Sequence, residues 1–402
     1  MGFAKQMWMR DQERGWSEPD AKCACPDHVE DPYLRDLIMD LPDENSCDYC
    51  GRTSDEPIAA SIAVLVESLA AVIDEYWDDA ENFVPWEGGW QLDVSDTWDV
   101  TEDFREYFDD SGIADDVLRC FLDRSLAKQS LMALDAEQQL RYGWKHFVEV
   151  VTHDTRYLFQ TRPAPLTDSE YYESVDGVAP WDMLDRLGEV TVTADLLHEL
   201  NTGTGFYRGR AHDCGATLNT AADLGTAPYK AALFSNRMSP AGIPMFYGAM
   251  DAETTIAEIA EQGKCVTVGL FLTAKPLVVV DFTKKLVLPS IFDIPQRRKR
   301  DVLRFVQGFV RDLQRPITKD GREHVDYVPT QIVTEYFRRT FPDCNVDGLL
   351  YPSAKKDDGV CCVLFVEHDR CVDISPEWPA RDDVLGLNPS TVVAVERRRL
   401  VH

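Results

Sequence analysis

Four cysteines near the amino terminus have the chemistry and spacing of metal ligands. One residue separates Cys23 from Cys25, and Cys47 and Cys50 follow as a Cys-x-x-Cys pair with a glycine directly after it. A tight turn of this kind lets two thiolates approach one ion, and tetrahedral zinc takes four such ligands. The sequence predicts a structural zinc site, because so small a module, rich in Asp, Pro and Gly, needs a metal to fold.

The first pair of this predicted site is less regular than the second. Paired zinc ligands usually have about two to four residues between them, whereas Cys23 and Cys25 have one. His28 lies in the same segment and could replace either cysteine as a ligand. Four reduced thiols without a metal are the alternative, but four of the eleven cysteines fall within 28 residues, which favours a metal site.

A second group of chemically competent residues lies in the carboxy-terminal half. Arg237 stands in a loop that contains Pro and Gly, and Tyr247 follows ten residues later in the run MFYGA. Glu258 comes eleven residues after Tyr247, in a stretch with a helical pattern. Arg208 lies upstream in FYRGR, and Ser353 ends the run LLYPS downstream.

These residues, in this order, resemble the RES domain family, which is named for its Arg, Glu and Ser. The resemblance covers about residues 195–375, and the three family residues match Arg237, Glu258 and Ser353. It implies a fold similar to that of the ADP-ribosyltransferase toxins and an NAD-degrading activity of the kind found in toxins paired with antitoxins. The segments SCDYCG and GWKHFVEVVTHDTRYLF look like a module that accompanies RES and HEPN domains.

The resemblance also implies a role for each matched residue. Cleavage of the nicotinamide–ribose bond places positive charge on the sugar, which a fixed carboxylate such as Glu258 would stabilise. Arg237 and Arg208 would grip the diphosphate of NAD through paired hydrogen bonds. The ring of Tyr247 would face the nicotinamide, and Ser353 would donate to a phosphate or ribose oxygen.

Each of these residues also has an ordinary structural interpretation. Glu258 could be an exposed helix residue, and Arg237 could pair with a surface carboxylate in so acidic a chain. Tyr247 could be core packing and Ser353 a turn residue. Their joint occurrence favours an active site. The assignment of Arg208 competes with that of Arg210, two residues later.

We therefore expect NAD to be a substrate that is degraded by hydrolysis or phosphorolysis. Transfer of ADP-ribose to a macromolecule is an alternative, with Glu253 or Glu261 positioning the acceptor. A zinc-bearing interaction protein with an inactive RES-like half is an alternative of another class. Arg141 and His146 have the Arg-x-x-x-x-His spacing of HEPN ribonucleases, but aromatic residues surround them in a strongly acidic chain.

The overall charge narrows the classes of partner. The 402 residues include 70 acidic and 41 basic side chains, for a formal charge of −29. Such a field repels phosphate backbones and anionic membranes, so we expect neither broad nucleic-acid binding nor membrane attachment. Eleven cysteines and no secretory signal predict free thiols or metal ligands in a cytoplasmic protein, not a disulfide framework. The resemblance adds an antitoxin or regulatory protein and a homodimer as expected partners.

The elements that must position these residues follow from the hydrophobic pattern. The predicted class is α+β, with a helical amino-terminal region, a small zinc module and a mixed RES-like domain. The predicted segments are a flexible tail (1–17), the zinc module (18–56), a helical domain (57–160), a linker (161–189) and the catalytic domain (190–402). Strands are predicted at 268–272, 276–282, 347–352 and 360–366. Helices are predicted at 58–77, 113–139, 137–151, 252–262, 297–313 and 330–340.

Overall fold

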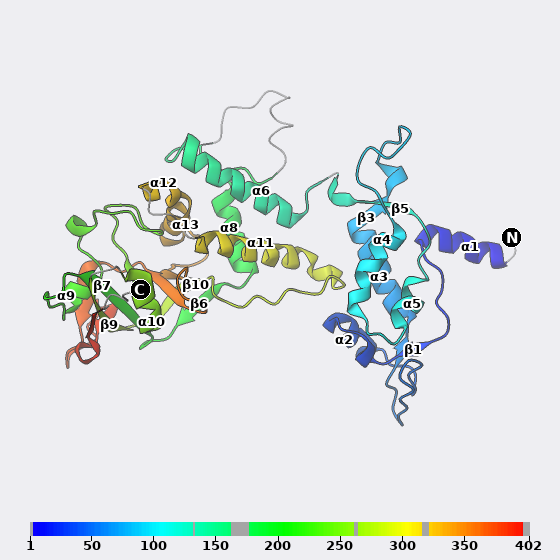
Figure 1. Ribbon diagram of the computed structural model, residues 1–402, viewed down its shortest axis with the longest axis horizontal. Coiled ribbons are helices and arrows are strands. Elements are labelled where there is room, and N and C mark those ends of the chain that lie inside the picture. Colours follow the sequence, from blue (N-terminus) through cyan, green and yellow to red (C-terminus); the bar gives the residue numbers. More distant parts are fainter. Residues whose placement is uncertain (1–2, 132, 162–176, 261–263, 316–320, 397–402) are drawn as a thin grey trace, which may run out of the picture. The chain divides into compact units, whose positions relative to one another are not determined.

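Figure 1 shows the computed structural model, which describes residues 3–131, 133–161, 177–260, 264–315 and 321–396. The chain divides into two compact units. The first unit contains Met1–Asp135 and Leu288–Asp301, and the second contains Ala136–Val287 and Val302–His402. Helices and strands occur together in both, which confirms the predicted α+β class.

Helix α3 (Ala63–Tyr76) is the centre of the first unit. Its sequence is rich in Ala and Leu, which favour helix, and its buried side chains include Leu65, Leu69 and Val72, spaced to form one face. Helices α2 (Pro32–Asp40) and α5 (Ile113–Leu118) pack against this helix (Figure 1). The other helices of this unit are α1 (Phe3–Arg14) and α4 (Thr97–Glu102).

Two small antiparallel sheets complete the first unit. Their strands are β1 (Cys23–Ala24) with β2 (Ala60–Ser61), and β3 (Trp77–Asp79) and β4 (Ser95–Asp96) on either side of β5 (Ser125–Lys128). The prediction of one long helix over 113–139 is therefore wrong. The chain leaves α5 after Leu118 because the strand at 125–128 hydrogen-bonds to two partners.

The predicted tail (1–17) is also wrong, because most of it is helix α1 and its end is buried. Trp16 is only 9% exposed and belongs to the core of the first unit. The Arg14 guanidinium lies 3.6 Å from the centre of the Trp16 ring, and Ser17 donates its backbone N–H to Cys120. Burial of this indole anchors the segment.

The second unit contains one large sheet. Its strands are β6 (Leu197–Leu200), β7 (Gly205–His212), β8 (Phe246–Ala249), β9 (Cys265–Thr273), β10 (Leu277–Asp281), β11 (Gly348–Pro352), β12 (Val360–Leu364), β13 (Cys371–Asp373), β14 (Leu385–Leu387) and β15 (Val393–Glu396). The order is β13-β14-β9-β7-β8-β12-β11-β10-β6, and β15 pairs with β9. The Lys-Pro turn after β9 thus leads to a distant strand, whereas β11 and β12 are antiparallel neighbours.

The α-helices among the described residues of the second unit are α6 (Ala136–Glu149), α8 (Met183–Thr193), α9 (Ala221–Leu224), α10 (Ala252–Ile259), most of α11 (Arg297–Gln314), α12 (Glu323–Asp326) and α13 (Val328–Arg339). Helix α6 was assigned to the helical domain (57–160), but Trp144 on it packs edge-on against Phe309 of α11, with ring centres 4.9 Å apart. Of the predicted linker (161–189), residues 162–176 lie outside the described residues, and α8 includes its last residues.

One segment of the carboxy-terminal half folds with the first unit. The ring of Phe292 packs against Tyr107 and Phe104, at centre distances of 5.1 and 5.9 Å. Residues 18–135 share this unit, so the zinc module and the first helices are not separate bodies. Contacts between residues far apart in sequence decide these boundaries.

The alternation of side chains gives the large sheet two different faces. Phe206, Phe246, Phe271 and Cys362 are fully buried and form part of a hydrophobic core on one face. Helix α10 packs on the opposite face, where Gly209 of β7 leaves room for it. A methyl group at Gly209 would lie 2.5 Å from the side chain of Ile259 in α10.

The cysteines of the second unit include one disulfide, between Cys214 and Cys265. This pair departs from the expectation of free thiols or metal ligands, although a single bond is not a disulfide framework. It joins the segment after β7 to the first residue of β9. Among the described helices, none combines the length and the apolar character that a bilayer span requires.

Candidate functional site

A cavity of about 670 Å³ opens on the face of the sheet that carries α10. Tyr247 and Ala249 of β8, Cys361 of β12 and Tyr351 of β11 are among its lining residues. They share one face because residues two apart on a strand point the same way, and Cys361 pairs directly with both Ala249 and Tyr351. Four of the predicted site residues line this cavity: Arg208, Arg237, Tyr247 and Glu258.

Glu258 lies near the end of α10, a helix that begins where the Asp251 side chain accepts the backbone N–H of Thr254. Its carboxylate oxygen Oε1 accepts hydrogen bonds from the Ser353 hydroxyl at 2.5 Å and from the backbone N–H of Ala354 at 3.2 Å. No described residue donates to Oε2. One oxygen is thus held, and the other is free for a ligand.

Ser353 has a different position from the one expected. It is buried and does not line the cavity, and its hydroxyl accepts the backbone N–H groups of Lys355 and Lys356 at 3.1 Å each. These two bonds orient the hydroxyl so that its proton goes to Glu258. The geometry makes Ser353 a residue that positions the carboxylate, in place of the predicted donor to phosphate or ribose.

Cys361 is a second neighbour of the carboxylate that sequence reasoning missed. Its sulfur lies 3.7 Å from Oε1 of Glu258. Burial raises the pKa of Cys361 to about 12, so the thiol keeps its proton and can donate it to the carboxylate. The sequence signal is weak, because VCCVLFV is an ordinary apolar strand in which either cysteine could face the cavity.

A hydrogen bond joins Arg208 to the backbone of Tyr247. The Tyr247 hydroxyl bonds to the Ser239 hydroxyl at 2.9 Å, and its backbone carbonyl accepts a hydrogen bond from the Arg208 guanidinium. Arg208 also donates to the Leu224 carbonyl at 2.6 Å. Arg208 therefore fixes strand β8 in place at the edge of the cavity. Arg210 donates to the Gly225 carbonyl and does not line the cavity. Of the two arginines of FYRGR, Arg208 is therefore the one that belongs to the candidate site.

Arg237 is held by the end of helix α11. Its guanidinium donates to the Leu313 carbonyl at 2.6 Å and to the Arg315 carbonyl at 3.1 Å, and it lies 5.8 Å from the centre of the Tyr327 ring. A guanidinium has five N–H donors, so three remain for a ligand in the cavity. Arg237 forms no ion pair with any described residue, contrary to its ordinary structural interpretation.

The charges that line the cavity contrast with those of the whole chain. Among the described residues of the lining, Arg208, Arg237 and Lys355 are cations and Glu258 is the single carboxylate. Burial, followed by the nearby charge of Arg210, lowers the pKa of Arg208 to about 10, which leaves it protonated at neutral pH. A net positive cavity in a chain of charge −29 favours an anionic ligand.

The residues that the sequence offered for other activities do not line this cavity among the described residues. Glu253 lies on α10 but is exposed and pairs with Lys356 at 3.1 Å. Glu261 lies outside the described residues. Arg141 and His146 are both exposed on α6, where Arg141 pairs with Glu137 at 3.1 Å. Residues five apart on a helix point in different directions, so these two do not face one another.

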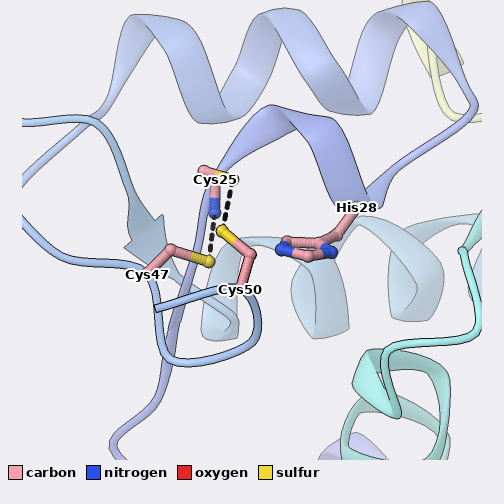
Figure 2. Close-up of side chains that lie close together, drawn as sticks. All are labelled: Cys25, His28, Cys47 and Cys50. Atoms are coloured by element: carbon pink, nitrogen blue, oxygen red, sulfur yellow. Dashed lines mark hydrogen bonds between the residues drawn. The ribbon is translucent and has the colours of Figure 1, made fainter. Parts of the chain in front are cut away.

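Four side chains of the first unit form a candidate metal centre. Cys25, His28, Cys47 and Cys50 place their ligand atoms within 4.8 Å of one another, and Figure 2 shows Cys25 and His28 at the two ends of a short helical turn and Cys47 and Cys50 on a loop beside it. The sulfurs of Cys25 and Cys50 lie 3.8 Å apart. Two sulfurs bound tetrahedrally at the usual zinc–sulfur distance of about 2.3 Å would have roughly this separation.

Cys23 does not belong to this group, so the predicted ligand set changes in one member. Cys23 lies in strand β1 opposite Ser61, and its backbone N–H donates to Asp48 at 2.7 Å. Cys25 precedes a 3-10 helix, Pro26–His28, and His28 is its last residue. The backbone N–H of His28 donates to the Cys25 carbonyl at 3.3 Å, and this turn brings the two side chains together.

The two ring nitrogens of His28 support its role as a ligand. Nδ1 hydrogen-bonds to the Asp109 carboxylate at 2.8 Å, and Nε2 is buried without a hydrogen-bond partner among the described residues. Histidine ligands commonly hold the other ring nitrogen against a carboxylate in this way. The unsatisfied nitrogen indicates a metal ion as the missing partner.

The electrostatics of the cluster favour a thiolate at Cys47 and a positive charge on His28, whereas burial raises the pKa of Cys25 to about 12. Burial opposes ionisation of Cys47, but the backbone N–H groups of Cys50, Cys25 and Tyr49 hold its pKa below the usual range. Burial alone would lower the pKa of His28, yet the Asp109 carboxylate and Cys50 raise it to about 9. With four protein ligands and no position left for water, the residues fit a structural zinc ion.

Replacing Asp109 by alanine should weaken zinc binding about ten- to a hundred-fold, because His28 loses the carboxylate that orients its ring. Competition with a chromogenic chelator measures this affinity. Asp110→Ala is the matched control, since Asp110 is exposed and makes no contact with the cluster. Equal zinc affinities of the Asp109→Ala and Asp110→Ala proteins would contradict a positioning role for Asp109.

Two segments of the chain match known protein families. Residues 207–383 match the RES domain, and residues 42–165 match HEPN/RES N-terminal domain 1. The chain therefore contains a RES domain and, ahead of it, an amino-terminal HEPN/RES module. No curated protein and no solved structure shows a significant match.

Proposed function

We propose that the chain degrades NAD by cleaving the bond between nicotinamide and ribose. The observation that carries this proposal is the carboxylate of Glu258, held at one oxygen by Ser353 and Ala354 and facing a cavity whose other charged side chains, among the described residues, are cationic. The cavity volume of about 670 Å³ falls within the range of ligand pockets, about 300–1,000 Å³. The match to the RES domain, a family of toxin-like and NAD-related proteins, agrees with this activity.

The reaction needs a stabiliser of positive charge more than an acid. The bond from C1′ breaks with both electrons going to the ring nitrogen, so nicotinamide leaves as a neutral molecule. The ribose becomes oxocarbenium-like, and the carboxylate of Glu258 stabilises that charge. Water then adds to C1′ and releases its proton to solvent, or phosphate adds in its place.

The remaining residues serve binding and orientation. Ser353, Ala354 and Cys361 fix the carboxylate before the substrate arrives, so little reorganisation is needed in the transition state. The free N–H groups of Arg237 bind the diphosphate. The ring of Tyr247 packs against the nicotinamide, and burial raises the pKa of its hydroxyl, which stays protonated.

Incubation of the purified protein with NAD tests the proposal directly. Products are identified by chromatography and mass spectrometry, with and without phosphate. Free nicotinamide with ADP-ribose indicates hydrolysis, and ADP-ribose 1″-phosphate indicates phosphorolysis. Intact NAD after prolonged incubation with folded, zinc-loaded protein would contradict the proposed function.

Replacing Arg237 by alanine should raise the KM for NAD about ten- to a hundred-fold and change kcat less. A guanidinium that grips the diphosphate acts in the ground state as well as in the transition state, and one charged hydrogen bond contributes about 1.5–3 kcal/mol. Initial rates over a range of NAD concentrations measure both constants. Because Arg237 also bonds to Leu313, thermal unfolding must be compared. A lower kcat with an unchanged KM would contradict this role.

A further inference from the structure

A second cavity in the RES domain collects cations from separate parts of the chain. Its volume is about 280 Å³, and it is lined by Lys275, Arg338, Arg339 and Arg370. Lys275 stands in the turn between β9 and β10, and Arg338 and Arg339 are at the end of α13. Arg370 ends a short 3-10 helix before β13. None of its described lining residues also lines the cavity around Glu258.

The lining also contains two carboxylates, Asp347 and Glu367, and each accepts a hydrogen bond from a group other than the four cations. Asp347 accepts the backbone N–H of Val278 at 2.9 Å. Glu367 accepts the hydroxyl of Tyr229 at 3.3 Å. Neither carboxylate lies within ion-pair distance of a described lysine or arginine, although the charge of Glu367 acts on Arg338 from farther away. The described lining thus has four cations against two carboxylates.

Three of the four cations have no ion-pair partner among the described residues. Arg370 pairs with Asp382 at 3.3 Å. Lys275, Arg338 and Arg339 pair with no described carboxylate, although the chain has 70 acidic residues and only 41 basic ones. Unpaired cations that converge on one cavity in so acidic a chain indicate a ligand of opposite charge.

The helix dipole explains only part of this cluster. Arginines in the last turn of α13 interact favourably with the carbonyl end of that helix. This effect does not account for Lys275, which comes from a turn between strands. Arg338 is also half-buried, and this burial together with the adjacent charge of Arg339 lowers the pKa of Arg338. The helix dipole does not offset this cost. A bound anion would compensate both effects.

We propose that this second cavity binds a small, multiply charged oxyanion through its phosphate group, either as free phosphate or as part of a phosphorylated metabolite. Guanidinium groups match the geometry of phosphate oxygens, and the lysine adds a mobile charge at the rim. The volume is just below the usual range of ligand pockets, about 300–1,000 Å³, and suits a phosphate group better than a whole dinucleotide.

Isothermal titration of the full-length protein with inorganic phosphate and, separately, with AMP tests the site. The combined change Arg338→Gln and Arg339→Gln should weaken binding at least about tenfold. Lys275→Gln, from a different element, should weaken it in the same direction and leaves α13 untouched. Arg311→Gln is the matched control, because Arg311 stands in the last turn of another helix and lines neither cavity.

Loss of affinity for both ligands would support recognition of the phosphate group itself, and loss for AMP alone would support a phosphorylated metabolite. Affinities for phosphate and AMP that stay at the wild-type values in both the double variant and Lys275→Gln would overturn the proposal. Because Glu258 and Arg237 are unchanged in these variants, NAD cleavage can persist or fail independently of this result.

Discussion

Replacing Glu258 by glutamine should lower the turnover of NAD about a hundred- to a thousand-fold while NAD binding changes little. The amide keeps the shape of the side chain, and its oxygen can still accept the Ser353 hydroxyl and the Ala354 N–H. Only the negative charge is lost. An interaction that forms mainly in the transition state appears in kcat rather than in KM.

Glu253→Gln is the matched control for this experiment. Glu253 lies on the same helix and carries the same charge, but it is exposed and pairs with Lys356 on the surface. Such pairs contribute about 1 kcal/mol or less, so we expect near-normal turnover. Steady-state kinetics with circular dichroism separates catalysis from folding. Near-normal turnover of Glu258→Gln would refute the assignment of this carboxylate.

Changing Cys47 and Cys50 to serine should abolish zinc binding and unfold the amino-terminal module. Apparent binding free energies of structural zinc are about 10–16 kcal/mol in small modules at neutral pH, which exceeds the stability of most domains. The zinc ligands Cys25 and Cys47 share a small core with Ala59, while Ala24 and Val29 tie the same segment to the main core of the first unit. Elemental analysis gives the zinc content, and calorimetry shows the lost unfolding transition.

Cys23→Ser distinguishes the two possible ligand sets. The geometry assigns Cys25, His28, Cys47 and Cys50 to the ion, so Cys23→Ser should retain one zinc per chain. His28→Ala should lose most of it. The reverse result, with zinc lost from Cys23→Ser and kept by His28→Ala, would restore the set of four cysteines.

Local patterns predicted much of the carboxy-terminal half. The strands at 348–352 and 360–364 follow apolar runs, and α10 begins at a capping Asp251, so the helical position of Glu258 followed from neighbouring residues. Tyr247 and Glu258 reach one cavity as expected. The role of Ser353 could not be predicted, because it depends on which way one hydroxyl points after the turn.

The errors in the amino-terminal half have a common physical origin. Helix α6 belongs to the second unit because Trp144 packs on Phe309, 165 residues later in the chain, and no local pattern contains that contact. Cys23 is drawn away from the metal cluster by pairing with Ser61. The Cys25-x-x-His28 spacing was visible, but the 3-10 helix that aligns the two side chains was not.

The glycine of FYRGR sets a constraint on related sequences. Helix α10 carries Glu258 and lies so close to β7 that a side chain at Gly209 would collide with Ile259. A search that asks only for the arginine, glutamate and serine would accept chains in which a bulkier residue here has pushed the helix outward. Selection of relatives should therefore require a small residue at the position of Gly209, although this residue has no functional group of its own.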